Sequence, residues 1–157
     1  MRESIADTPP TQQAKAVGMK VDRQAVLLDR SKHFTFILTE QAVRYPLVSA
    51  DAMALQIDRL VSVSRLGNVR IGVLPMDRKF SSTPLSTFTV YDDRLATIET
   101  DLGAAVFRGS KDVQSLVARF DGYASHAIFG DNARELLVQW ARIFRRWSLV
   151  HNGHISP

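Results

Sequence analysis

Apolar positions in the first third of the chain change from helical spacing to strand spacing. From Thr8 they recur every three or four residues, which predicts a helix that ends near Asp29. Residues 33–39 then alternate between apolar and polar types and predict a strand. A short helical turn is expected over residues 40–45, because the residue before Pro46 is disfavoured in a helix.

The middle of the chain predicts a helix, a buried strand and a hairpin. Ser49 is a suitable cap for a helix that runs from residue 50 to about residue 66. The β-branched run at residues 69–74 predicts a strand, with Val69, Ile71 and Val73 on one buried side. Two further strands, at residues 86–91 and 94–100, flank Asp92-Asp93 at the spacing of a tight hairpin.

The last third is predicted to be helical. Ser110 is expected to cap a helix that runs to about Phe129, and Asn132 to cap a second helix that runs to residue 149. The second helix has an apolar face, expected to be buried, that comprises Leu136, Leu137, Trp140, Ile143, Phe144 and Trp147. Three arginines, Arg142, Arg145 and Arg146, lie mostly on its opposite side.

Together these elements predict an α+β fold. We expect a small antiparallel or mixed sheet of about four strands, packed with helices and followed by the helical C-terminal third. With 157 residues and 45% hydrophobic content, the chain is long enough for one core and short for two. The predicted organisation is therefore an N-terminal tail over residues 1–10, one domain over 11–149 and a disordered tail over 150–157.

The amino-acid composition excludes some classes of function but does not identify one. The chain has no cysteine, which excludes disulfides, thiolate catalysis and thiolate metal sites. The sequence has no run of about 18 apolar residues, the length needed to span a bilayer, and no secretory signal. We therefore expect a cytoplasmic protein without membrane contact. The net charge of +4 permits nucleic acid or an acidic protein as a partner and requires neither.

A set of residues in a particular order gives the sequence a family resemblance. In chain order they are Arg23-Gln24, Glu40 with Arg44, Gln56, Asn68-Val69, Leu74-Pro75, Phe88 and Glu99. Over residues 16–147 this pattern resembles the C-terminal domain of unknown function that follows a helix-turn-helix in actinobacterial Xre-type transcriptional regulators. The sequence itself contains neither a helix-turn-helix nor the family's Pro-Gly-Leu-Leu-Gln-like linker. A stand-alone or N-truncated copy is therefore expected.

The resemblance implies a regulatory and antitoxin-like role. Regulators of this kind are often encoded beside a small companion protein, so the resemblance implies a protein-interaction or ligand-sensing domain. Contact with DNA would then be made by a separate helix-turn-helix, or only weakly by this chain. A homodimer stays open as well, because Trp140 and Trp147 could form either a buried face or an exposed dimer patch.

The resemblance also selects Glu40, Arg44 and Glu99 as candidate ligand- or partner-binding residues. Glu40 and Arg44 are four residues apart and share one face of the short helix, whereas Glu99 lies at the end of a strand. Two carboxylates near one guanidinium could form a structural brace or the wall of a recognition pocket. We expect a brace at Arg44 and recognition at Glu99. The alternative is an enzyme that uses the three residues on a small polar substrate.

A second candidate surface is the arginine cluster of Arg142, Arg145 and Arg146. It could bind DNA phosphates without sequence specificity, with Trp147 as a stacking surface, or it could simply stay solvated beside the helix terminus. The four histidines (His33, His126, His151 and His154) include no pair at the helical spacing of metal ligands. Neither a Gly-x-Ser-x-Gly motif nor a glycine-rich phosphate loop is present. We therefore predict no catalytic residue, no cofactor and no metal.

Overall fold

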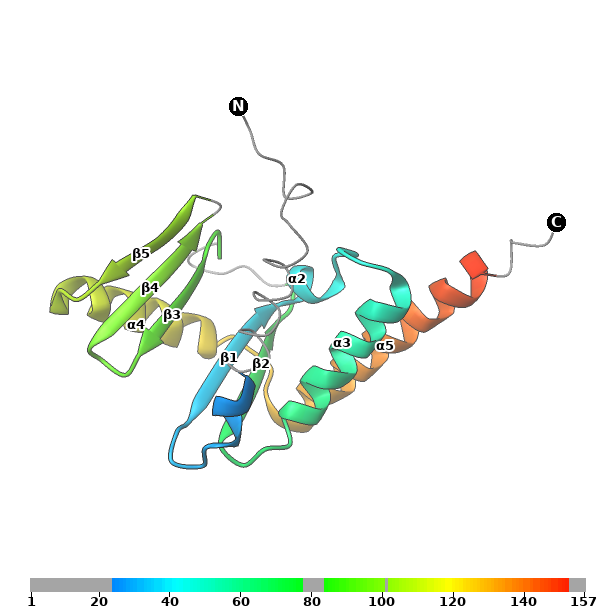
Figure 1. The fold of residues 1–157 in the computed structure, drawn as a ribbon, viewed down its shortest axis with the longest axis horizontal. Helices are drawn as coiled ribbons and strands as arrows, with labels where there is room; N and C mark the ends of the chain where they lie inside the picture. The colour runs from blue at the N-terminus through cyan, green and yellow to red at the C-terminus, as the bar shows by residue number, and fades with distance from the viewer. Residues whose placement is uncertain (1–23, 78–83, 101, 153–157) are drawn as a thin grey trace, which may run out of the picture.

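The described part of the chain contains two sheets, each packed with helices. The computed structural model describes residues 24–77, 84–100 and 102–152. Its five strands form one parallel pair and one three-stranded antiparallel sheet (Figure 1). The predicted α+β class is confirmed, although the strands divide between two sheets and do not form a single sheet of four.

The first sheet pairs β1 (Phe34–Thr39) with β2 (Val69–Leu74) in parallel. The predicted burial of Val69, Ile71 and Val73 is confirmed, because these side chains pack into the main core. Within the described residues β2 pairs along its length with β1 alone, and on its other side it makes one isolated bridge to Ile128. The strand is therefore buried without being the centre of a wide sheet.

Two helices connect β1 to β2, and both begin at the residues that the sequence predicts. For α2 (Glu40–Arg44), the Thr39 hydroxyl accepts a hydrogen bond from the backbone N–H of Ala42 at 3.1 Å. For α3 (Ala50–Val63), Ser49 caps the first turn in the same way. The long C-terminal helix α5 (Gly130–Asn152) lies beside α3, and the two cover β2 (Figure 1).

The second sheet has the order β3-β4-β5, with strands β3 (Thr87–Tyr91), β4 (Leu95–Thr100) and β5 (Gly103–Phe107). It packs on α4 (Ser110–Ala124) around a smaller core that contains Ala96, Val113 and Leu116. The predicted hairpin is confirmed, but its loop has three residues because β4 begins at Leu95. Asp92 adopts a positive φ of 54°, which aspartate tolerates better than most residues.

The C-terminal helices differ from the prediction at their ends. Gly109, not Ser110, is the cap of α4, and α4 ends at Ala124, before the predicted Phe129. The next residues instead form a connection in which Ile128 exchanges two backbone hydrogen bonds with Val73. The predicted cap at Asn132 instead lies inside the first turn of α5, which begins at Gly130 and continues through Asn152.

Phe129, in the connection between α4 and α5, lies against β2 at Gly72. A Cβ atom at Gly72 would come within 2.5 Å of the Phe129 ring, so the ring takes the space that a side chain would need. On the ring, the Arg70 guanidinium carbon lies 4.8 Å from the centroid. The connection is thus held to the first sheet by both backbone and side-chain contacts.

Some predictions lie outside the described residues. These are the helix from Thr8, the N-terminal tail, Arg23, most of the loop over residues 76–84, His154 and the last five residues. The short 3-10 turn Val26–Leu28, capped at Asp29, lies where the predicted first helix was expected to end.

Candidate functional site

Glu40 joins the start of α2 to the chain that follows β2. One carboxylate oxygen accepts a hydrogen bond from the Arg44 guanidinium at 2.5 Å, and the other accepts the backbone N–H of Met76 at 3.0 Å. The Glu40 side chain is only 16% exposed. Burial raises its pKa, but the Met76 N–H and the Arg44 guanidinium outweigh burial and hold the pKa below its usual range. Glu40 is therefore ionised at neutral pH.

Arg44 reaches from α2 towards α5. While it is paired with Glu40, its guanidinium carbon also lies 6.0 Å from the centroid of the Trp140 ring. Its side chain remains 49% exposed. A guanidinium that is fixed by a carboxylate and an aromatic ring, yet open to solvent, is well placed to donate to an anionic group of a ligand.

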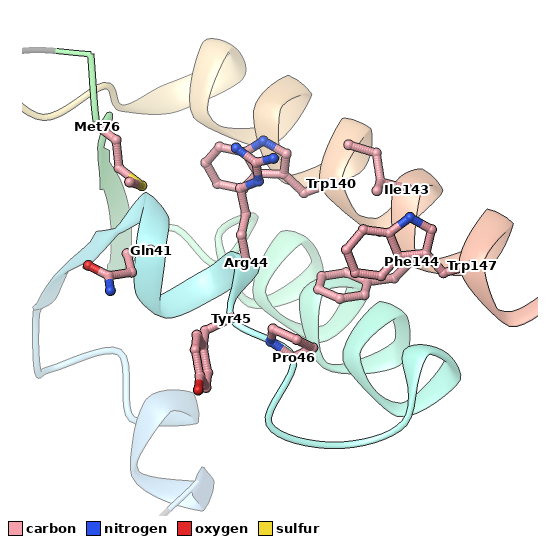
Figure 2. Close-up of a pocket in the computed structure, with 9 residues that line it drawn as sticks. All are labelled: Gln41, Arg44, Tyr45, Pro46, Met76, Trp140, Ile143, Phe144 and Trp147. Carbon is pink, nitrogen blue, oxygen red and sulfur yellow. The ribbon is translucent and has the colours of Figure 1, made fainter.

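A groove with a volume of about 280 Å³ lies between α2 and α5; we call it the α2–α5 groove. Figure 2 shows the side chains that line it. Gln41, Arg44, Tyr45, Pro46 and Met76 come from α2 and the ends of the first sheet, and Trp140, Ile143, Phe144 and Trp147 come from α5. The lining is therefore mostly apolar and aromatic with two polar side chains, which is the usual make-up of a binding site.

The α5 wall of the groove is only partly buried. Trp140 and Phe144 are nearly covered, whereas Trp147 is 47% exposed and meets the Phe144 ring edge-on at a centroid distance of 5.4 Å. The prediction that Trp147 belongs to a buried face is therefore wrong. Because α3 packs against the adjacent side of α5 and nothing described covers Trp147 fully, an aromatic surface is left open to solvent.

Exposed apolar side chains continue beyond the groove. Tyr45 lines it, and the loop that follows Pro46 exposes Leu47 and Val48 to 74% and 53%. Met76 on the rim is also exposed. The apolar surface is therefore wider than the groove itself, a feature typical of interaction sites.

Of the three predicted site residues, the structure brings only Glu40 and Arg44 together. Glu99 lies on β4 in the other sheet, exposed between its cross-strand neighbours Thr87 and Ala104. In the described ranges, no ion pair or hydrogen bond joins Glu99 to Glu40 or Arg44. The side chains of Ala96 and Ile98 do point to the smaller core, as the strand alternation predicts.

The arginine cluster is divided by its contacts. Arg145 pairs with Asp58 of α3. Arg142 and Arg146 are exposed one turn apart on α5, and none of the described ion pairs includes them. The three guanidinium groups therefore do not present a single uniform surface.

Sequence reasoning did not anticipate the groove. The aromatic spacing of α5 predicted a buried face, and only the position of α2 reveals which part of that face stays open. Within the described part of the chain, no group of three His, Asp or Glu side chains could hold a metal ion. None of the described helices is long and apolar enough to cross a membrane.

Comparison with known proteins gives one family. A family model described as a domain of unknown function (DUF5753) matches residues 1–139. No curated protein and no solved structure matches the chain.

Proposed function

The chain belongs to the DUF5753 family of domains of unknown function, and on that premise we propose that it is a regulatory domain that binds a partner protein or senses a ligand through the α2–α5 groove. It would serve an Xre-type, antitoxin-like transcriptional regulator of actinobacterial type. The regulator's DNA contacts would come from a separate helix-turn-helix. The partner would be a small cytoplasmic protein whose gene lies nearby.

The observation that carries this proposal is the open aromatic groove. Large aromatic side chains beside an arginine are enriched at the energetic centres of protein interfaces. Here Trp147 is half exposed next to Phe144, with Arg44 opposite. Leaving such apolar area in water costs free energy, which burial against a partner would recover.

The continuing apolar surface at Leu47 and Val48 favours a protein partner over a small ligand. A small molecule could fill a volume of about 280 Å³ but would leave these neighbours exposed. A protein surface could cover both.

The catalytic alternative has less support. Glu40 is held ionised by the Met76 N–H and by Arg44, whereas a general acid or base works best with a pKa near the working pH. Glu99 lies in the other sheet. The arginine cluster supports DNA binding weakly, because Arg145 is paired with Asp58.

The test is retention of the purified companion protein by the immobilised chain and two variants. Trp147→Ala removes half-exposed aromatic surface from the groove. Tyr91→Ala removes a similarly exposed aromatic from the hairpin of the second sheet and is the matched control. We expect the parent and Tyr91→Ala to retain the companion, and Trp147→Ala to bind it at least about tenfold more weakly.

Binding of the companion by Trp147→Ala as tightly as by the parent would contradict the proposal. So would a parent chain that does not retain the companion. Circular dichroism of each variant separates a lost contact from a lost fold.

A further inference from the structure

The exposed side of α5 next to the groove carries two positive charges without a described counter-charge. Arg142 and Arg146 are four residues apart, where like charges repel and weaken a helix. From Leu136 to Asn152 the helix contains no aspartate or glutamate. Among the described residues, the nearby acid Asp58 pairs with Arg145 instead.

The helix dipole does not account for both arginines. Its favourable effect on cations is confined to the last turn of a helix. Arg142 lies ten residues before the end of α5 at Asn152, and Arg146 lies six before it. Their unbalanced charge therefore needs another explanation.

Arg146 lies beside the aromatic wall of the groove, and Arg142 lies further around α5. At 100° per residue, Arg146 is directed about 60° from Ile143, which lines the groove, and Arg142 a further 40° around the helix. Arg44 stands on the other side of the groove, half exposed. The groove thus has an apolar floor, with the exposed charge of Arg146 on its α5 side and, on its α2 side, a guanidinium that is paired with Glu40 but still half exposed.

The floor also has the shape that suits a helix. Its α5 residues, Trp140, Ile143, Phe144 and Trp147, follow the spacing i, i+3, i+4, i+7. A row of side chains at this spacing forms a ridge against which a second helix packs. Amphipathic helices bind such grooves by inserting apolar residues at the same spacing.

We infer that the α2–α5 groove binds an acidic amphipathic helix of a partner protein, whose apolar side chains cover Trp147 and Phe144 and whose carboxylates meet Arg44 and Arg146. This inference rests on the proposed function and names the chemistry of the partner. Aspartate or glutamate at the edge of that helix would relieve the repulsion between Arg142 and Arg146 and fix the helix's orientation.

The test uses two blocked helical peptides that share one apolar stripe of leucine and phenylalanine. One carries glutamate on its polar positions and the other carries glutamine. Binding is followed by isothermal titration calorimetry, which reports on the parent and on variants that lack Trp147 alike. Arg146→Glu reverses a charge beside the groove, and Arg119→Glu reverses that of an exposed arginine of α4 as the matched control.

We expect the parent to bind the glutamate peptide about tenfold more tightly than the glutamine peptide, with a preference that shrinks at high ionic strength. Arg146→Glu should remove the preference, Arg119→Glu should keep it, and Trp147→Ala should weaken both peptides.

Equal affinity for the two peptides, or no binding of either, would overturn the inference. If Trp147→Ala no longer binds the companion protein but Arg146→Glu has no effect on peptide binding, the proposed function stands and the inference of an acidic helix is wrong. Saturable binding of phenylacetate without peptide binding would assign the groove to a small acid. A dimer in sedimentation that Trp147→Ala dissociates would assign it to a second copy of the chain.

Discussion

Asn68 connects the start of β2 to the turn that precedes β1. Its side-chain nitrogen lies within 3.0–3.1 Å of three backbone carbonyl oxygens, those of Leu27, Asp29 and Lys32. The residue is almost fully buried. One side-chain amide therefore ties the turn that precedes β1 to the start of β2.

Replacing Asn68 by alanine should destabilise the protein by roughly 1–3 kcal/mol, since the hydrogen bonds from its side chain to the carbonyls of Leu27, Asp29 and Lys32 would be lost. Denaturant unfolding measures the change. Asn132→Ala, at an exposed position in the first turn of α5, is the control and should change stability by less than about 0.5 kcal/mol. Equal stability of the two variants would show that the Asn68 contacts contribute nothing.

The Glu40 carboxylate gives a pH-dependent prediction. Because its pKa is lower in the folded state than in the unfolded chain, its stabilising effect is complete above about pH 4.3 and is lost as the pH falls through the folded-state value. At pH 7, Glu40→Gln should lower the melting temperature by roughly 2–6 °C. The difference from the parent should narrow as the pH falls, because the parent's Glu40 takes up a proton as the pH passes through its lowered folded-state pKa.

Melting curves of the parent and Glu40→Gln from pH 7 to pH 3 test this. Glu135→Gln, at an exposed position of α5, serves as the control with the same change of charge. A gap between the parent and Glu40→Gln that stays constant over this range would contradict the assignment.

At the scale of elements, β2 is the strand on which the main core depends. Ile71 is 4% exposed and packs within the same cluster as α3 and α5. Substituting Ile71→Asp would place an unpaired carboxylate there, at a cost of several kcal/mol. Thr89→Asp, at an exposed position of β3, makes a similar change at the surface. We expect thermal melts to show a large drop in melting temperature for Ile71→Asp and a small one for Thr89→Asp. A drop of only a degree or two for Ile71→Asp would contradict the burial of this strand.

Elements with a strong local signal could be predicted from the sequence. The hydroxyl cap at Ser49 and the proline at position 46 act within one turn, so α3 begins at the residue that the cap indicates and α2 ends before the proline. The alternation at Val69, Ile71 and Val73 likewise reports a one-sided core.

Elements that depend on distant partners could not be predicted. The strand β5, with the sequence Gly-Ala-Ala-Val-Phe, has small residues and no alternation, and its conformation comes from pairing with β4. Glycine at position 130 is a common helix terminator, yet the bridge between Ile128 and Val73 ends the preceding segment earlier.

The candidate site was predicted only in part, because some of its contacts are local in the sequence and others are not. The Glu40 and Arg44 pair follows from a spacing of four residues on one short helix. The groove requires α2 to lie beside a helix about a hundred residues later in the chain, and no local pattern reports that contact. Glu99 was grouped with the pair through the family resemblance, although the strand that carries it belongs to another sheet.

At the scale of the whole molecule, the connection between α4 and α5 links the part containing the second sheet to the first sheet through its contacts with β2. Gly72→Ala should cost about 1–3 kcal/mol in unfolding free energy, because the new Cβ would meet the Phe129 ring. In a Phe129→Leu background the same substitution should cost clearly less. Denaturant unfolding of the four proteins of this cycle measures the coupling, and an equal cost in both backgrounds would mean that the ring does not limit position 72.

The close approach of Phe129 to Gly72 also has a consequence for how related sequences can diverge. Because the Phe129 ring touches the backbone at Gly72, the space between the two positions can hold only one large side chain. A substitution at either position therefore requires a compensating change at the other. Relatives with glycine at the position of Gly72 should retain an aromatic residue at that of Phe129. Relatives with a larger residue at the first position should carry a smaller one at the second. An alignment of the family would therefore show covariation between two positions that lie more than fifty residues apart.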